Sequence, residues 1–457
     1  MNVLKKSYIE TFGCQMNERD SEIMGQMLCN ANYSPTDDIR QADVIVINTC
    51  SIREKAEQKV YSLLGRLKKL KEKKPKLIIS VAGCVAQQEG ERLQARMPLV
   101  DIVVGPQQIY RLPELVRTVA LKCEPLLEVD LSPSFEIPKY EPPSPGTSRQ
   151  ISARAGSSGH FKKFVTIMQG CNNFCTYCVV PFTRGRETSR DPEDIITEIQ
   201  ALTDQGIKEV TLLGQNVNSY GKSDDGTREY ISFPELLRQV AAIENIKRVR
   251  FTTSHPKDLS PELINCFAEI EKLCPHFHLP VQSGSNAILK SMHRKYSVEE
   301  YLARVDALRQ VRPDIALTTD IIVGFPGETD KDFQATLELL EFIRFHGAFS
   351  FKYSDRPQAR AVKFENKVAE DVKSERLKCL QEKQNEISLQ RNREYEDSLQ
   401  LVMVEGNSKN GEDQWTGRTM SNIIVNFAGP KNLSPGQEVL VKINDGLLHS
   451  VRGIMFS

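Results

Sequence analysis

The sequence has no excess of charge of either sign and no long apolar run. Its 457 residues include 60 lysines and arginines and 60 aspartates and glutamates, so the formal net charge is zero. This balance excludes a polycationic nucleic-acid-binding tail but not a local basic face. No apolar stretch approaches the ~20 residues that cross a bilayer, and the first ten residues lack the apolar core of a signal peptide. We therefore expect a cytoplasmic protein with no membrane partner.

Cysteine is too sparse for a fold held together by disulfides, with eleven residues in the whole chain. In the reducing compartment that this indicates, the thiols are free to bind metal. Hydrophobic residues make up 40% of the chain and charged residues 26%, which is typical of folded proteins and excludes disorder over most of the length. At ~100 to 200 residues per domain, we expect several domains.

Four segments follow one another along the chain. Strand-like runs alternate with helical periods over residues 4–122, which predicts a doubly wound α/β domain with a parallel sheet. Residues 123–156 are rich in Pro and Ser and predict a linker. Within residues 157–389 the alternation resumes for six units, two fewer than a closed TIM barrel. We therefore predict a partial (β/α)6 TIM-like barrel with its site at the C-terminal ends of the strands. Valine-rich short strands within residues 390–455 predict a small OB-like β-barrel.

One group of cysteines lies in a single loop after the first predicted barrel strand and consists of Cys171, Cys175 and Cys178. Three thiolates at this spacing can hold three corners of a cubane iron–sulfur cluster and leave the fourth iron open for chemistry. The alternative is a structural zinc site with a fourth ligand such as His160. Zinc sites usually pair their ligands as Cys-x-x-Cys, so this alternative is less favoured.

A second group, Cys14, Cys50 and Cys84, is scattered in sequence, but each cysteine directly follows a predicted strand. The C-terminal ends of parallel strands share one edge of a sheet, where ligands bind. We therefore expect the three thiols to converge on one site. Three unrelated buried thiols are the alternative, but they would not explain the repeated placement. The remaining five cysteines share no spacing and are expected to be small core residues.

The motif Cys-x-x-x-Cys-x-aromatic-Cys at residues 171–178, with Tyr177 before the last cysteine, resembles the radical S-adenosylmethionine (SAM) superfamily. The second cysteine group and the terminal barrel, which resembles a TRAM domain, extend the similarity to the methylthiotransferases over nearly the whole chain. The stretch SIREKAEQK after Cys50 is similar to the MiaB-type branch of that family. Further matching stretches are FGCQMN, PFTRGRETSR, PVQSGS, MHRKY and DIIVGFPGET.

This resemblance implies two 4Fe-4S clusters and two molecules of SAM. One SAM would methylate a sulfur attached to an auxiliary cluster on Cys14, Cys50 and Cys84. The second would be cleaved reductively at the cluster on Cys171, Cys175 and Cys178 to give a 5′-deoxyadenosyl radical. Such a radical can abstract the unactivated hydrogen on C2 of adenine, which explains why a cofactor has to perform this step. The six cysteines are therefore candidate catalytic residues as well as metal ligands.

The MiaB-type branch modifies N6-isopentenyladenosine adjacent to the tRNA anticodon. The expected partners are thus a tRNA anticodon stem-loop that bears this base and an electron donor such as flavodoxin or ferredoxin, and the chain is expected to be a monomer. Two alternatives stay open. One is the same chemistry on threonylcarbamoyladenosine in tRNA or on a ribosomal protein, and the other is a non-catalytic, metal-stabilised RNA-binding protein.

Residues at the C-terminal ends of the predicted barrel strands, together with one residue of the cysteine loop, are candidates for SAM binding. They are Tyr177, Gln215, Asn216, Ser254, Gln282 and Gly324. The pattern departs from the superfamily, because Asp320 stands at the first position of its glycine-containing motif and Glu328 lies one place beyond the usual acid. For each candidate the alternative is an ordinary strand-end polar group that is bonded to the backbone.

Contacts to RNA are expected in two places. The C-terminal segment from residue 399 has no net charge, so binding there would rest on shape and on aromatic and polar contacts from Trp415, Arg418 and Asn422. Trp415 is equally compatible with a place in the core of the small barrel. Arg184 and Arg186 directly follow the cysteine loop and are candidates for contacts to phosphate or SAM.

Overall fold

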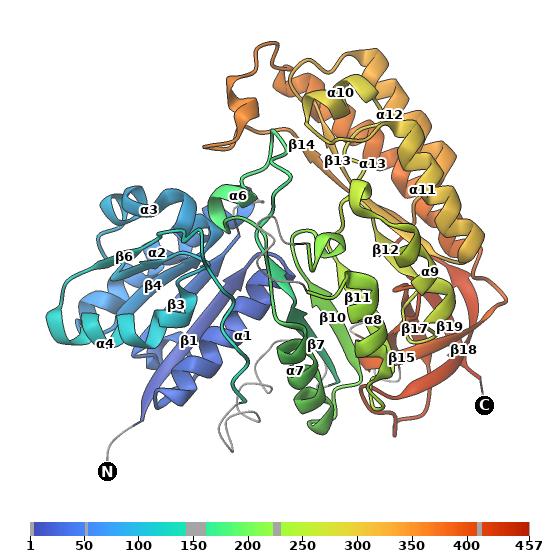
Figure 1. Ribbon diagram of the computed structural model, residues 1–457. Helices are drawn as coiled ribbons and strands as arrows, with labels where there is room; N and C mark the ends of the chain where they lie inside the picture. The colour runs from blue at the N-terminus through green and yellow to red at the C-terminus, as the bar shows by residue number, and fades with distance from the viewer. Residues whose placement is uncertain (1–3, 51–53, 143–160, 223–229, 409–413, 457) are drawn as a thin grey trace. The chain divides into compact units, whose positions relative to one another are not determined.

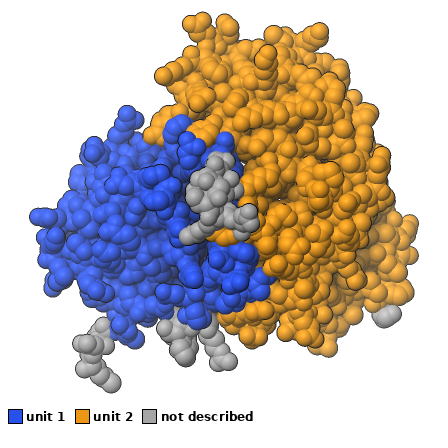
Figure 2. Space-filling model, viewed as in Figure 1, with its two compact units in different colours: residues 1–157, 164–172, 180–198 blue, residues 158–163, 173–179, 199–457 orange. Residues whose placement is uncertain are grey.

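The computed structural model describes residues 4–50, 54–142, 161–222, 230–408 and 414–456. The chain forms two compact units (Figure 2). Unit 1 contains residues 1–157, 164–172 and 180–198, and unit 2 contains residues 158–163, 173–179 and 199–457. Among the helices described, none is both long enough and apolar enough to span a membrane.

Unit 1 is built on a six-stranded parallel sheet with the order β2-β1-β3-β4-β5-β6 (Figure 1). The strands are β1 (Lys5–Phe12), β2 (Tyr33–Pro35), β3 (Val44–Thr49), β4 (Ile78–Gly83), β5 (Ile102–Val104) and β6 (Leu126–Glu128). Every residue of β3 and β4 is buried, which is typical of a parallel sheet covered on both faces.

Helices cover both faces of this sheet. Residues of α2 (Glu54–Lys73) and α3 (Cys84–Arg96) share one core with Ile45, Ile47, Ile79 and Val81. Residues of α1 (Gln15–Asn30) and α4 (Leu112–Lys122) share the other core with the alternate positions of the same strands, Val44, Val46, Ile78 and Ala82. Alternate side chains of a strand point to opposite faces, so the two cores show the doubly wound arrangement that the sequence predicts.

The predicted boundary after residue 122 needs a correction. Residues 126–128 were expected in the linker, whereas they form β6, which pairs with β5 in parallel from Ile102↔Leu126 onward. This strand has only three residues and lies between polar and proline-rich stretches, which explains why periodicity did not reveal it. Residues 143–156 of the predicted linker lie outside the described residues.

Several short elements flank the cysteine loop of residues 171–178 in the sequence, where the chain passes from one unit to the other. Strand β7 (Lys162–Thr166) begins in unit 2 and ends in unit 1, and α7 (Pro192–Asp204) begins in unit 1 and ends in unit 2. Between them, β8 (Met168–Gln169) pairs antiparallel with β9 (Thr188–Ser189) in unit 1, and α6 (Val180–Thr183) belongs to the same unit.

Most of unit 2 is an arc of parallel strands that are separated by helices, in agreement with the predicted partial barrel. The strands are β10 (Glu209–Leu213), β11 (Arg248–Thr252), β12 (His276–His278), β13 (Ala316–Val323) and β14 (Gly347–Lys352). The helices are α8 (Phe233–Ala242), α9 (Pro261–Glu269), α10 (Asn286–Ser291), α11 (Val298–Val311) and α12 (Asp330–Ile343). A Ser or Thr side chain caps the N-terminus of each of these five helices. A parallel bridge, Val249↔Leu273, links the region of β11 to that of β12.

The C-terminal part of unit 2 is a separate closed barrel with the strand order β15-β16-β17-β19-β18. Helix α13 (Glu370–Arg393) precedes its strands β15 (Leu399–Asn407), β16 (Gln414–Thr419), β17 (Ile424–Ala428), β18 (Glu438–Gly446) and β19 (Val451–Met455). Buried valines, together with Trp415 and Phe427, fill its interior. The five-stranded OB-like barrel that the sequence predicts is thus present.

Candidate active site

In unit 1, the strand-end group of Cys14, Cys50 and Cys84 lies at one edge of the parallel sheet. Phe12 of β1, Thr49 of β3 and Gly83 of β4 are neighbours in register, so the three strands end at the same level. Cys14 then caps the N-terminus of α1, Cys50 follows β3 directly, and Cys84 is the first residue of α3. The structure therefore places Cys14, Cys50 and Cys84 at one sheet edge, where their sequence positions suggested that they would converge.

Two glycines let these loops approach each other. A Cβ atom on Gly13 would stand 2.7 Å from the Cβ of Cys50, closer than such atoms can pack. Gly83 has a φ of 92°, and a Cβ atom there would stand 2.4 Å from Oδ1 of Asn48. Only glycine satisfies both the backbone angle and the close contact at this position.

A pair of buried asparagines, which sequence reasoning did not single out, ties the first two cysteine loops together. The Nδ2 of Asn17 donates to Oδ1 of Asn48 at 2.9 Å, and the Nδ2 of Asn48 donates to the carbonyl of Asn17 at 2.8 Å. The thiol of Cys14 in turn donates to Oδ1 of Asn17 at 3.2 Å. Asn17 belongs to the stretch FGCQMN and Asn48 to the stretch NTC. Their closeness in sequence to Cys14 and Cys50 was the signal that could have identified them.

Arg184 belongs to this cysteine site and not to an exposed surface. Its Nη2 lies 2.6 Å from Oδ2 of Asp20, and the two side chains are only 3% and 4% exposed. A hydrogen bond with the Cys50 thiol is the main cause that lowers the pKa of Cys14 to about 6, and the charge of Arg184 lowers it further. Burial raises the pKa of Cys84, against the effect of Arg184. Arg184 was expected to contact phosphate or SAM, and in this structure its guanidinium is covered by residues of unit 1, so the expected contact stays a prediction.

The donor set at this sheet edge is compatible with an iron–sulfur cluster. Among the described side chains, no three of the His, Cys, Asp and Glu type already form a group that could hold one metal ion. The thiolates of a cubane cluster bind different iron atoms, so they surround the cluster and do not have to meet at one point. Three cysteines at one sheet edge provide such ligands for three irons.

The group of Cys171, Cys175 and Cys178 belongs to one loop whose residues are divided between the units. In unit 1, Cys171 follows Gly170, which has a φ of 83°, and its amide donates to the carbonyl of Gly185 at 3.2 Å. In unit 2, the amide of Cys178 donates to the carbonyl of Cys175 at 3.0 Å. His160, the alternative zinc ligand, lies outside the described residues.

Arg294 is a second functional candidate that sequence reasoning missed. Its Nη1 donates to Sγ of Cys175 and to the hydroxyl of Tyr177, both at 3.4 Å. The other nitrogens of the buried side chain donate to the Tyr296 hydroxyl at 3.0 Å and to the Pro280 carbonyl at 2.9 Å. Arg294 lies in the stretch MHRKY, which the resemblance to the methylthiotransferases had already highlighted.

The candidate SAM residues lie at the C-terminal ends of the unit 2 strands, but not all of them are available for a ligand. Asn216 is committed to its own chain, because its Oδ1 accepts from the amide of His255 at 3.0 Å and its Nδ2 donates to Asp258 at 2.8 Å. Its neighbour Gln215 is half-buried. Gln282 has a φ of 74° and bonds the backbone on both sides of Ile321, through its amide to Asp320 and through its carbonyl to Ile322.

Gly324 and Tyr177 also have partners within unit 2. The amide of Gly324 donates to Oε1 of Glu328 at 2.9 Å, and Arg376 lies 2.8 Å from the same carboxylate. Burial raises the pKa of Glu328, whereas the Gly324 amide and the Arg376 charge lower it. The hydroxyl of Tyr177 accepts from Arg294. These two positions are thus linked to carboxylate and guanidinium groups that the sequence did not reveal as partners.

Buried polar atoms without partners mark the ends of β10 and β11. The Oγ of Ser254, the Nε2 of His255 and both side-chain polar atoms of Asn218 have no hydrogen-bond partner among the described residues. The Nδ1 of His255 accepts from the Lys257 amide, and burial holds the pKa of this histidine well below its usual value, so Nε2 carries the proton. Together these atoms offer donors and acceptors to the polar groups of a ligand such as SAM.

The other expected RNA contacts are in the C-terminal barrel, apart from Arg186, which is exposed in unit 1. Trp415 is 9% exposed, belongs to the barrel core and donates from Nε1 to the Pro430 carbonyl at 3.1 Å. The structure thus favours its packing role. Arg418 donates to Oδ1 of Asn422 at 3.3 Å and lies 3.3 Å from Glu405, so these groups bond to the chain itself.

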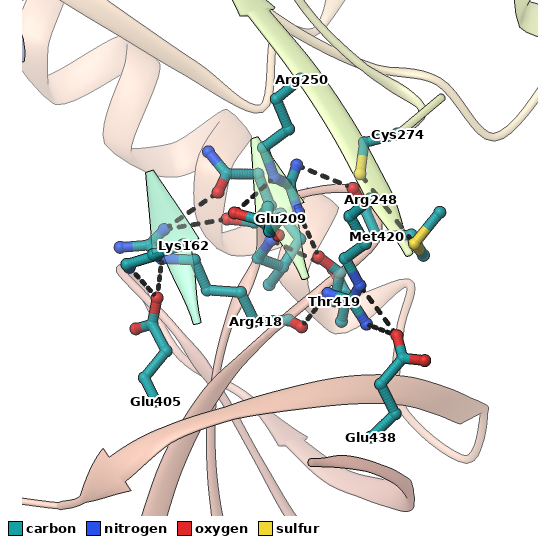
Figure 3. Close-up of polar contacts among 12 residues, drawn as sticks. Lys162, Glu209, Arg248, Arg250, Cys274, Glu405, Arg418, Thr419, Met420 and Glu438 are labelled. Atoms are coloured by element: carbon teal, nitrogen blue, oxygen red, sulfur yellow. Dashed lines mark hydrogen bonds and ion pairs between the residues drawn. The ribbon is translucent and has the colours of Figure 1, made fainter. Parts of the chain in front are cut away.

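Two buried arginines of β11 hold the C-terminal barrel within unit 2 (Figure 3). Arg248 is fully buried and lies 2.9 Å from Glu438, and it donates to the Arg418 carbonyl at 2.8 Å. Arg250 donates to the carbonyls of Met420 and Thr419 at 2.9 and 3.0 Å. Arg248 begins β11 and Ser254 follows its end, so the C-terminal barrel contacts the end of the sheet opposite to the candidate SAM residues.

Comparisons with known proteins cover nearly the whole chain. Family models match in three stretches: the uncharacterized protein family UPF0004 over residues 6–105, the radical SAM superfamily over residues 165–340, and the TRAM domain over residues 393–456. A protein of Desulfotalea psychrophila named tRNA-2-methylthio-N(6)-dimethylallyladenosine synthase is 52% identical over 98% of each chain. A protein of the same name from Geobacter metallireducens is 49% identical over 98% of each chain. Another from Clostridium botulinum is 48% identical over 97% of this chain and 95% of its own.

Solved structures agree with the fold. The radical SAM methyltransferase TsrM from Kitasatospora setae has a TM-score of 0.55 at 12% identity and covers 76% of this chain and 73% of its own. The cobalamin-dependent radical enzyme OxsB has a TM-score of 0.52 at 13% identity, over 83% of this chain and 56% of that one. At such low identity the likeness concerns the fold alone, and it supports the assignment of the central region to a radical SAM fold.

Proposed function

Because the chain belongs to the family of tRNA-2-methylthio-N(6)-dimethylallyladenosine synthases, we propose that it replaces the hydrogen on C2 of N6-isopentenyladenosine, adjacent to the tRNA anticodon, by a methylthio group. It is thus a radical SAM tRNA methylthiotransferase that uses iron–sulfur chemistry. The structural observation that carries the proposal is the set of three cysteines at the level ends of β1, β3 and β4, in addition to the radical SAM motif. The proposed methylthio transfer requires such a second set of ligands in addition to the radical site.

Each cysteine group would hold one 4Fe-4S cluster, with Cys14, Cys50 and Cys84 at the auxiliary site and Cys171, Cys175 and Cys178 at the radical site. When bound, the radical-site cluster supplies the electron that cleaves SAM, and a second SAM provides the methyl group. Three thiolates per site leave one iron at each cluster for a ligand other than the protein. An external protein such as flavodoxin or ferredoxin would provide the electrons.

The chain's own residues orient these groups. Arg294 bonds both Cys175 and Tyr177, so it fixes the loop that carries the radical-site thiolates. Ser254, His255 and Asn218 present unpartnered polar atoms, which would bind the polar groups of SAM. Asn216 holds the backbone of His255 and in this way positions the residues around it.

The RNA partner is a tRNA anticodon stem-loop, and a monomer would bind it. Support comes from the TRAM domain and from the exposed Arg186 two residues beyond the buried Arg184. The modified adenine has to leave its stack to reach a radical, as in other enzymes that modify bases. The C-terminal barrel would then bind nucleotides of the tRNA that are remote from the reacting base.

Nucleoside mass spectrometry of tRNA from cells that lack the protein tests the substrate. We expect N6-isopentenyladenosine to accumulate and its 2-methylthio derivative to disappear, with recovery on expression of the intact chain but not of Cys84→Ala. If isopentenyladenosine is unchanged and a methylthio form of threonylcarbamoyladenosine disappears, the proposed substrate is wrong. Anaerobic reconstitution tests the clusters, since two 4Fe-4S sites require about eight irons per chain, one site about four, and a zinc site none.

A further inference from the structure

A strongly basic segment of unit 2 bonds to the loop of the radical-site cysteines. Residues 356–364 contain Arg356, Arg360 and Lys363 and no acidic residue, in a chain whose formal net charge is zero. Arg360 and Lys363 are exposed, and no carboxylate among the described residues forms an ion pair with either of them. The segment is thus a local positive patch, which a neutral total charge does not exclude.

The backbone of this segment is fixed against the cysteine loop. The amide of Ala361 donates to the carbonyl of Thr176 at 2.9 Å. Ala361 is fully buried and belongs to a small core against which both Tyr177 and Phe364 pack. The two exposed cations on either side of Ala361 therefore extend from a segment that this core holds in place beside the loop.

Lys295 supplies a third exposed cation from another segment that bonds to the same loop. The amide of Thr176 donates to the carbonyl of Met292 at 3.1 Å. Lys295 directly follows Arg294, whose guanidinium donates to Sγ of Cys175 at 3.4 Å. The Lys295 side chain is exposed and has no ion-pair partner among the described carboxylates. Cations from two separate segments thus lie next to one loop.

The acids nearest in sequence do not neutralise these cations. The carboxylate of Asp355 accepts from Nζ of Lys367 at 2.6 Å. Both carboxylate oxygens of Glu299 accept from the side-chain amide of Asn286, at 3.2 and 3.0 Å. Glu365 is exposed to solvent. The three cations are therefore available to an anion from outside the protein.

We propose that Lys295, Arg360 and Lys363, which we call the basic rim, bind phosphodiester groups of the RNA on both sides of the base that enters the radical site. The inference rests on the proposed function, which makes RNA the substrate. Each nucleotide within a strand has a phosphate on either side, so a base that leaves its stack and reaches the cysteine loop brings phosphates to the residues around that loop. Arginine binds a phosphate through two N–H groups and lysine binds it as a point charge. Such contacts position the RNA without reading its sequence.

The test uses the reconstituted full chain and a fluorescein-labelled anticodon stem-loop that bears N6-isopentenyladenosine. The rim variant combines Lys295→Met, Arg360→Met and Lys363→Met. Fluorescence anisotropy over a potassium chloride series, under anaerobic conditions, gives the slope of log affinity against log salt concentration. Release of 5′-deoxyadenosine without RNA, with dithionite as the reductant, shows whether the radical site is intact.

A matched control removes the same amount of charge from exposed positions on helices. It combines Arg92→Met in α3, Arg238→Met in α8 and Lys378→Met in α13. We expect the slope to fall by about three in the rim variant, about one for each lost phosphate contact, and to keep the parent value in the control. Release of 5′-deoxyadenosine should not change in either variant. A fall of at least about two in the rim variant supports the inference, and a smaller fall overturns it.

Three other results are distinguishable. If the parent chain does not bind the stem-loop, the proposed substrate fails, which differs from binding that ignores the basic rim. If RNA binding is unchanged while flavodoxin reduces the rim variant more slowly than the parent chain, the rim binds an acidic electron donor and the inference is wrong. Loss of 5′-deoxyadenosine release in the rim variant passes the decision to Lys363→Gln alone. A slope lower by about one in that variant supports the inference, and the parent slope overturns it.

Discussion

Each cysteine group has a buried arginine beside it, but among the described residues only Arg184 has an acid as its partner. Arg184 forms an ion pair with Asp20, whereas the hydrogen-bond partners described for Arg294 are the Tyr177 and Tyr296 hydroxyls, the Pro280 carbonyl and the Cys175 sulfur. A guanidinium stays charged even when buried. Among the described residues, the Cys175 sulfur is the contact of Arg294 that would become an anion on binding a metal. The arginine beside Cys14 and Cys84 is thus paired with a carboxylate, whereas the described partners of the arginine beside Cys175 include no carboxylate.

Among substitutions of the buried arginines, the largest loss of stability is expected at the Arg184–Asp20 ion pair. Arg184→Met leaves the Asp20 carboxylate buried without a cation and should destabilise unit 1 by about 3 to 5 kcal/mol. Adding Asp20→Asn should restore more than half of the loss, because the buried charge disappears. Hydrogen–deuterium exchange of the β3 and β4 amides in the metal-free chain measures the change. A double variant that is no more stable than Arg184→Met would show that the carboxylate is not the source of the cost.

A smaller loss is expected at Arg294, where no carboxylate is left behind. Arg294→Met removes the donors to Pro280 and Tyr296 and should cost about 1 to 3 kcal/mol in the metal-free chain. Exchange of amides around β12 and α10 gives the value, and Arg312→Met, at a half-buried arginine at the end of α11, is a control within the same unit. If Arg294→Met costs as much as Arg184→Met, the contrast between the two arginines is wrong.

Arg248 extends the comparison to a buried arginine whose acid partner still reaches water. Glu438 is 28% exposed, so Arg248→Met leaves a carboxylate that stays solvated, and we expect a loss of only about 1 to 2 kcal/mol. Trp415 is the single tryptophan of the chain, so its fluorescence follows unfolding of the C-terminal barrel in denaturant. Lys442→Met at the exposed ion pair with Asp397 serves as the control and should change stability by less than about 0.5 kcal/mol. A loss equal to that of Arg184→Met would show that partial exposure of the acid does not matter.

Features that follow from local sequence patterns could be predicted, whereas features that depend on contacts between distant residues could not. Periodicity and strand-end spacing predicted the doubly wound sheet, the arc of parallel strands and the shared edge of Cys14, Cys50 and Cys84, because these features follow from local patterns. The burial of Arg184 was not predictable, since Asp20 lies 164 positions away and an arginine-rich stretch is typical of a solvated surface. The role of Trp415, in RNA binding or in the core of the barrel, could not be decided from the sequence either. An aromatic residue of a strand packs inward or outward according to register, which the sequence alone does not fix.

Arg186, two residues beyond Arg184, should show the smallest effect on stability and a distinct effect on RNA. It is exposed, so Arg186→Met should change the stability of unit 1 by less than about 0.5 kcal/mol. If it contacts a phosphate of the anticodon stem-loop, the slope of log affinity against log salt concentration should fall by about one. Fluorescence anisotropy over a potassium chloride series measures this slope, with Arg92→Met as an exposed control.

Arg184→Lys should leave the slope as it is, because a buried side chain releases no counterions. Equal slopes for Arg186→Met and the intact chain would remove Arg186 from the RNA contacts, and a reduced slope for Arg184→Lys would contradict its assignment to the cysteine site.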